Sequence, residues 1–182
     1  MRAHCYLALI LTTSIAASAA HANEPMADSR VKLTHNIVAY NGTPSFTIEV
    51  PAGSVLVKRS DPKVMVAALQ TPDNVIIEAS VAKVGPELVL ANAGLRYFEV
   101  MRRVVGRDHR LVLHQPVRLP GNIDGYRTDI AWSLVLPNKP PLPLHSTIVS
   151  TIQNGVWVFV AVHPKKASHR YIRVAQSIRL SP

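Results

Sequence analysis

Several short segments of the chain alternate between hydrophobic and polar residues, which is the pattern of β-strands that bury one face. Segment 46–50 reads Phe-Thr-Ile-Glu-Val and stops at Pro51-Ala52-Gly53. Segments 74–84 and 125–136 alternate in the same way, and the apolar run 64–69 lies between turn-forming residues. We therefore predict strands over these four segments.

Between Pro86 and Gly106 the period changes to that of a helix. Proline is favoured in the first turn of a helix and glycine just after its last residue. One face of this segment is apolar, with Leu90, Gly94, Phe98, Met101 and Val105, and the opposite face carries Asn92, Arg96, Glu99 and Arg103. A second helix is predicted over 169–178, with Ser168 as its N-cap, burying Tyr171, Ile172, Ala175 and Ile178.

The dipeptide Asn154-Gly155 between two apolar runs is the strongest short signal for a β-hairpin. A two-residue turn at this point fixes the register, which pairs Ile152 with Trp157, Ser150 with Phe159 and Ile148 with Ala161. Both faces of the hairpin are apolar, so we expect it to be covered on both sides. Segment 110–119 contains Pro116, which places that strand at a sheet edge or at a bulge.

The first 22 residues have the three parts of a secretory signal peptide. Arg2 supplies the positive charge, 6–17 the apolar run, and Ala20-His21-Ala22 the cleavage site. The alternative is an uncleaved membrane anchor, for which this run is short and interrupted by threonine and serine. We expect cleavage after Ala22 and a periplasmic or secreted protein, with a flexible leader over 23–44 and a single domain over 45–182.

Composition and charge narrow the class of protein further. The hydrophobic share of 48% excludes intrinsic disorder. The single cysteine, Cys5, lies in the predicted signal peptide, so the exported chain has neither a disulfide nor a cysteine nucleophile. Lysine and arginine outnumber aspartate and glutamate by 20 to 11. Because no nucleic-acid-binding module is recognisable and the protein is exported, an anionic envelope surface or an acidic protein fits this charge better than nucleic acid.

The order of predicted elements is strands, helix, antiparallel strands, helix. This order indicates an α+β fold, a mostly antiparallel sheet with helices on both faces. Five segments make the chain similar to a known group. They are the strand and turn 46–53, the helix 86–105, Gly125-Tyr126-Arg127, Asn154-Gly155-Val156-Trp157 and Ser177-Ile178. It resembles the PsbP-like superfamily of α/β/α sandwiches, which includes the photosystem PsbP subunit, nuclear Ran-binding relatives and bacterial DcrB-type envelope proteins. The resemblance implies a binding or assembly factor, since members are mostly non-enzymatic.

Candidate catalytic and metal-binding residues are few. The sequence contains no G-x-S-x-G, no H-E-x-x-H and no glycine-rich phosphate loop. Asp129, Ser133 and His145 are the residues from which a hydrolase site would be assembled, although Asp129 and Ser133 are about 13 Å apart along one strand. The histidine pairs His109 with His114 and His163 with His169 lack the spacing of metal ligands, so we predict no metal and no cofactor.

The candidate binding residues come from the basic surface and from one loop. Basic side chains near the end of the first helix also complement its dipole, which is the structural alternative to a binding role there. The proline-rich loop 137–143 is the most exposed irregular feature, and rigid loops often carry binding residues. The predicted binding residues are Arg102, Arg103, Tyr126, Arg127, Lys139 and His145.

The sequence therefore favours a non-catalytic binding or assembly protein of the cell envelope that contacts a protein partner or an anionic envelope surface. Two alternatives stay open. One is a hydrolase with an atypical site, and the other is an immunity or chaperone protein for a secreted effector.

Overall fold

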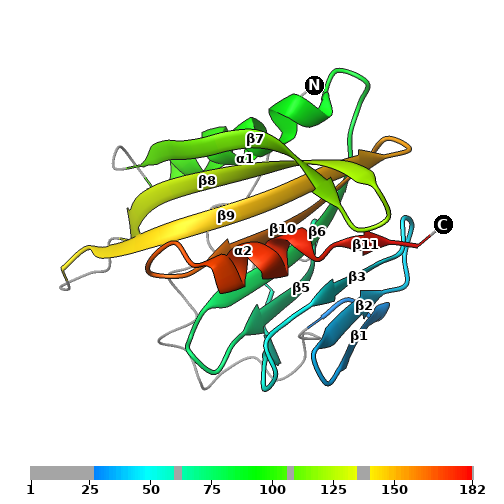
Figure 1. Cartoon of the computed structure of the whole chain (residues 1–182), viewed down its shortest axis with the longest axis horizontal. Coiled ribbons are helices and arrows are strands. Elements are labelled where there is room, and N and C mark those ends of the chain that lie inside the picture. Colours follow the sequence, from blue (N-terminus) through cyan, green and yellow to red (C-terminus); the bar gives the residue numbers. More distant parts are fainter. Residues whose placement is uncertain (1–26, 60–62, 106–108, 135–139, 182) are drawn as a thin grey trace.

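The structure, a computed structural model, describes residues 27–59, 63–105, 109–134 and 140–181, and only the backbone over 101–105. Figure 1 shows a large sheet with one helix behind it and, in front of it, a second helix beside a small sheet. The predicted signal peptide lies outside the described residues. The α+β class is confirmed by the two antiparallel sheets and the two helices of the described part.

The larger sheet has seven strands, and all of its neighbours are antiparallel. Its spatial order is β4 (Val55–Val57), β5 (Met65–Gln70), β6 (Ile76–Lys83), β10 (Val156–His163), β9 (Leu142–Gln153), β8 (Ile123–Leu134) and β7 (Arg110–Leu119). The smaller sheet has the order β1 (Val31–Thr34), β2 (Ile37–Tyr40), β3 (Phe46–Glu49) and β11 (Arg179–Leu180). The helices are α1 (Leu90–Val105) and α2 (His169–Gln176).

The hairpin of β9 and β10 forms the centre of the large sheet, and its predicted register is confirmed. Trp157 pairs with Ile152, Phe159 with Ser150, and Ala161 with Ile148. The turn residues Asn154 and Gly155 both have positive φ, at 51° and 71°, as a two-residue hairpin turn requires. The prediction for β7 also holds, because the strand that carries Pro116 lies at the edge of the sheet, with a bulge between Leu111 and Leu113.

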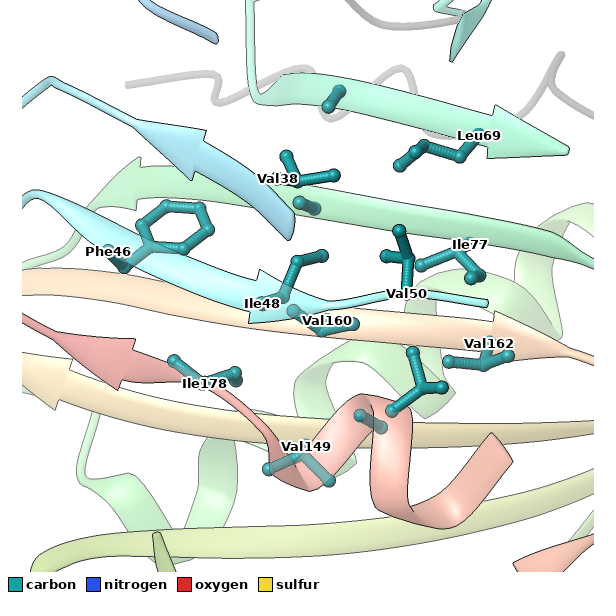
Figure 2. Close-up of a cluster of buried hydrophobic side chains, with 14 of the residues drawn as sticks. Val38, Phe46, Ile48, Val50, Leu69, Ile77, Val149, Val160, Val162 and Ile178 are labelled. Atoms are coloured by element: carbon teal, nitrogen blue, oxygen red, sulfur yellow. The ribbon is translucent and has the colours of Figure 1, made fainter. Parts of the chain in front are cut away.

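The two faces of the hairpin are covered by different elements, so it is buried on both sides as predicted. On one face Trp157, Phe159 and Ala161 pack with Ala93 and Tyr97 of α1. On the other face the valines of β10 pack against the small sheet and α2. Figure 2 shows this second cluster, in which Val38, Phe46 and Ile48 lie against Ile77, Val160 and Val162. The small sheet and α2 thus cover this face together.

The part of the predicted leader that the structure describes is not a flexible leader. Residues 31–40 form β1 and β2, and Val38 and Tyr40 are buried in the core. The two strands are joined at His35 and Asn36, with φ of 52° at His35. Histidine-asparagine is a weak turn signal and the strands have only four residues each, so the hairpin left little trace in the sequence pattern. The strands β4, with three residues, and β11, with two, are shorter still and were also missed.

The first helix begins at Leu90 and not at Pro86. Residues 85–89 form a turn instead, in which Leu88 N–H donates to the carbonyl of Gly85. The buried stripe is also rotated by about one residue from the predicted one, since Ala93, Gly94 and Tyr97 are buried while Phe98 is half-buried. The contact with β8 explains the rotation, because only a residue without a side chain fits where the helix comes closest to the sheet.

That close approach is made by Gly94 of α1 over Thr128 of β8. A Cβ atom on Gly94 would lie 1.8 Å from Thr128 Oγ1 and 2.9 Å from Thr128 Cβ. Thr128 is fully buried, and its hydroxyl is hydrogen-bonded to His114 at 3.0 Å. The side chain therefore has no free direction in which to move, and the helix has to shift if residue 94 grows.

We predict that Gly94→Ala destabilises the protein by about 1–2 kcal/mol, because overpacking of about 1–3 kcal/mol outweighs the gain of up to about 1 kcal/mol from helix propensity. Thr128→Ala removes the clashing oxygen, so the loss caused by Gly94→Ala should be smaller in that background. Urea denaturation of the four proteins of this cycle measures both effects. If the losses in the free energy of unfolding are purely additive, the proposed close contact between Gly94 and Thr128 is contradicted.

Candidate functional site

Two of the predicted binding residues, Arg127 and His145, are brought together by Asp129. All three side chains project from the sheet face that also carries α2, Arg127 and Asp129 from β8 and His145 from β9. The guanidinium of Arg127 donates to both carboxylate oxygens of Asp129, with Nε at 3.0 Å from Oδ1. His145 Nε2 lies 3.7 Å from Asp129 Oδ2. The exposed fraction of the side chain is 16% for Arg127, 4% for Asp129 and 12% for His145.

The environment of Asp129 favours its charged form. Burial alone would raise the pKa of Asp129, but the contacts with His145 and Arg127 outweigh burial and hold the pKa below its ordinary value. The site is therefore a nearly buried ion pair with a histidine beside it. The backbone N–H of His145 donates to the carbonyl of Pro164 at 2.8 Å, so the loop that leads into α2 is tied to the same place.

The other predicted site residues do not join this cluster. Tyr126 projects from the opposite face of β8, where its ring packs on that of His114 with centroids 5.0 Å apart. Lys139 lies outside the described residues. Arg102 and Arg103 belong to α1, but their side chains are outside the described part. The binding role of all six residues stays a prediction.

Ser133, the nucleophile of the hydrolase hypothesis, makes no hydrogen bond with His145 in the described part of the chain. It lies on the same face as Asp129, four residues further along β8. Asp129 itself is already engaged by Arg127. The arrangement of Asp129, Ser133 and His145 is therefore not a connected triad.

A second polar cluster, which the sequence analysis missed, lies on the α1 face of the sheet. Trp132 Nε1 donates to Ser146 Oγ at 2.7 Å, and Ser146 Oγ is 2.7 Å from His163 Nδ1. His163 Nε2 is 3.5 Å from Glu78 Oε2. A serine, a histidine and a carboxylate thus stand in the order used by serine hydrolases.

The predicted hairpin register contained the signal for this cluster. Continuing the register by one more pair on the same face, beyond Ile148 and Ala161, places Ser146 opposite His163. Both residues interrupt strands that are otherwise apolar. Glu78 does the same on β6, next to β10 in the sheet.

Burial decides what this cluster can do. Ser146, Glu78 and His163 are 0%, 3% and 5% exposed, and the Ser146 oxygen is held by the indole N–H of Trp132. Tyr97 lies nearby in the core, where burial, with a smaller contribution from Glu78, raises its pKa well above 10. The Ser146 hydroxyl has no exposed surface and is already hydrogen-bonded to Trp132 and His163, so this arrangement gives a substrate no access to it.

The histidines of the metal hypothesis are separated. His114 uses both ring nitrogens, Nδ1 with Thr128 Oγ1 and Nε2 with the carbonyl of Ala91 at 2.7 Å. His109 instead packs against Phe98, with ring centroids 5.0 Å apart. Among the described residues, no group of three or more histidine, cysteine or acidic side chains is placed to hold a metal ion.

A comparison with solved structures finds a known fold. The solution structure of cyanobacterial PsbP (CyanoP) from Synechocystis sp. PCC 6803 matches with a TM-score of 0.57 and 14% sequence identity, over 81% of this chain and 94% of that chain. The chain has a PsbP-like fold. No protein-family model and no curated protein matches the sequence.

Identity as low as that to CyanoP carries the fold alone, and the site residues are not transferred with it. Within the described residues of this PsbP-like fold, neither helix combines the length and hydrophobicity needed to cross a bilayer.

We predict that Asp129→Asn lowers the free energy of unfolding by about 3 kcal/mol at neutral pH, because Arg127 is left without its partner in a nearly buried place. The pKa of Asp129 is lowered in the folded state, so its contribution is complete above the unfolded value of about 3.9. It is lost as the pH falls through the folded value. The difference between wild type and variant should therefore shrink below about pH 4.

Asp124→Asn is the matched control on the same strand. Asp124 pairs with Arg118 at 2.6 Å, but its side chain is 73% exposed, so its loss should cost less than about 1 kcal/mol. Chemical denaturation of both variants across the acidic range measures the comparison. Equal losses for the two aspartates would contradict the role of burial at Asp129.

We predict that Ser146→Ala destabilises the protein by about 2 kcal/mol, because Trp132 Nε1 and His163 Nδ1 lose their common partner. Ser150 provides the control, since it lies on the same strand and face and its buried hydroxyl has no partner in the described part of the chain. Ser150→Ala should be neutral or stabilising. Thermal or urea denaturation distinguishes the two, and a Ser146→Ala variant as stable as wild type would contradict the prediction.

Proposed function

We propose that this protein is an exported, non-catalytic binding or assembly protein of the cell envelope, and that it acts by contact with an acidic protein or an anionic envelope surface. The PsbP-like fold is compatible with this role. Export is inferred from the signal peptide pattern at 1–22. The contact is inferred from the charge of the protein, +9 for the whole sequence.

One observation carries the proposal. The side chains that could take part in catalysis are bound to one another inside the fold. Asp129 is bound by Arg127, and Ser146 by Trp132 and His163. Catalytic groups need a path to substrate and a proton acceptor free to act. In the described part of the chain these groups have hydrogen-bond and ion-pair partners inside the protein.

A hydrolase is the second candidate, because Ser146, His163 and Glu78 have the right order for nucleophilic catalysis. Their burial opposes it. For activity the cover formed by α1 would have to leave the sheet, which would expose Trp157, Phe159 and the rest of the cluster they belong to. We therefore favour the contact function.

The test is retention of envelope components by the immobilised protein at about 0.05 M and about 0.5 M salt. The Debye length falls from roughly 14 Å to roughly 4 Å over this range, so a charge-driven contact should be lost at the higher concentration. An immobilised protein of similar size and positive charge but unrelated fold is the control for unspecific retention. Absence of salt-sensitive retention beyond that control would contradict the proposal, as would esterase, peptidase or glycosidase turnover that disappears in Ser146→Ala or His145→Ala.

A further inference from the structure

The acidic residues of this chain are confined to its first part. From Ile130 to Pro182 the sequence contains no aspartate and no glutamate. The same stretch contains six basic residues, Lys139, Lys165, Lys166, Arg170, Arg173 and Arg179. Positive charge in this part of the molecule can be neutralised only by a carboxylate that another element brings close.

Four of these residues form one exposed surface at α2, which we call the α2 surface: Lys165, Lys166, Arg170 and Arg173. Lys165 and Lys166 lie in the loop just before the helix, and Arg170 and Arg173 lie on its outer side. The inner side of α2 buries Tyr171, Val174 and Ala175. Figure 1 shows the helix lying across the front of the large sheet, which leaves its outer side open.

The rest of the protein supplies little negative charge to the α2 surface. Arg170 Nη1 lies 3.6 Å from Asp73 Oδ2, a weak contact between side chains that are both about half exposed. Asp73 is already an acceptor for the hydroxyls of Tyr171 and Thr71. In the described part of the chain, Lys165, Lys166 and Arg173 have no carboxylate partner. The neighbouring His169 is exposed as well.

Helix stability does not explain these charges. Cations stabilise the C-terminal end of a helix and destabilise the N-terminal end. Of the four residues only Arg173 is in the last turn, whereas the other three precede the helix or lie in its first turn. The first turn of α2 holds no acidic residue, and the Ser168 side chain makes no capping hydrogen bond. Three of the four charges therefore gain nothing from the helix dipole, which points to a role outside the folded chain.

We propose that the α2 surface binds the anionic headgroups of a lipid bilayer. The inference rests on the proposed contact function and assigns it a place and a partner. A protein interface usually has an apolar or aromatic centre, but the large apolar side chains exposed in the described structure all lie elsewhere, at Ile37, Val55, Val89, Leu111 and Val112. A bilayer surface needs no apolar centre, since four or more clustered basic residues are enough to attract it.

The α2 helix would lie on the headgroups without entering the acyl layer, because its apolar side is used by the protein core. Binding should therefore be electrostatic and fully reversible by salt. Each basic residue near an anionic leaflet strengthens binding about fivefold.

The experiment uses the chain that begins at Asn23, the predicted exported form, so that the apolar segment 6–17 does not enter the bilayer. Co-sedimentation is measured with vesicles of phosphatidylcholine that contain phosphatidylglycerol, and with vesicles of phosphatidylcholine alone. The variant carries Lys165→Gln, Lys166→Gln, Arg170→Gln and Arg173→Gln. The matched control carries Lys32→Gln, Lys83→Gln, Arg96→Gln and Arg110→Gln, four exposed residues away from α2. Circular dichroism and thermal melting verify that both variants fold.

We expect wild type and control to bind the anionic vesicles and not the neutral ones, and the α2 variant, which lacks four basic residues, to lose binding by roughly 600-fold. Equal losses in the two variants would overturn the inference, because overall charge and not the α2 surface would then be responsible. Binding to neutral vesicles would overturn it too.

Failure of the lipid inference can be told apart from failure of the proposed function. If the wild type ignores anionic vesicles but is still retained by an envelope extract in a salt-sensitive way, the lipid inference is wrong and the contact function stands. If that retention is lost in the α2 variant alone, the occupant of the surface is an acidic protein. If neither vesicles nor extract bind, both proposals are wrong.

Discussion

The hairpin of β9 and β10 is buried on both faces, and the rest of the structure depends on this constraint. A strand pair of this kind needs one layer over each side, and here α1 covers one side while the small sheet and α2 cover the other. A polar side chain buried within the pair loses its water partners, so partners inside the protein are favoured. The contacts of Ser146 with Trp132 and His163, and of Thr151 with the carbonyl of Asp124, follow from that preference.

The same constraint explains why parts of this core resemble an enzyme. A buried histidine favours polar side chains beside its ring nitrogens, and here Ser146 is hydrogen-bonded to Nδ1 of His163 while Glu78 lies 3.5 Å from Nε2. Such a set has the composition of a catalytic triad without its accessibility. Geometry between side chains is therefore insufficient for assigning activity in this fold, and the exposed fraction of the nucleophile has to be considered with it.

The long-range architecture could be predicted from sequence wherever the pattern was long or the turn chemistry specific. Asn154-Gly155 fixed the central pairing to the residue, and Pro116 marked the edge strand, because both act through the backbone. The small sheet could not be predicted in full, since its four-residue strands and its His35-Asn36 turn carry weak signals. The buried face of α1 differs by about one residue from the predicted face. The contact that decides it, between Gly94 and Thr128, is a tertiary contact and gives no periodic signal in the sequence.

The candidate site was predictable only in part, for a similar reason. Arg127 and His145 were identified, but their common partner Asp129 was assigned to a different hypothesis, since pairing between neighbouring strands cannot be deduced from one strand alone. The Ser146 cluster was within reach of the predicted register. The basic α2 surface depends on which side of the helix is buried, and for α2 the sequence predicted that side largely correctly, at Tyr171, Ala175 and Ile178.

The two edges of the large sheet limit how any other chain can approach it. At one border β4 has only three residues, and at the other β7 is interrupted by a bulge and by a proline that lacks a backbone donor. Open borders normally act as templates on which a foreign strand can add itself, and shortness, bulges and proline prevent this. The two borders of the large sheet therefore offer few main-chain groups to a foreign strand, so contacts at this sheet should be made mainly by side chains.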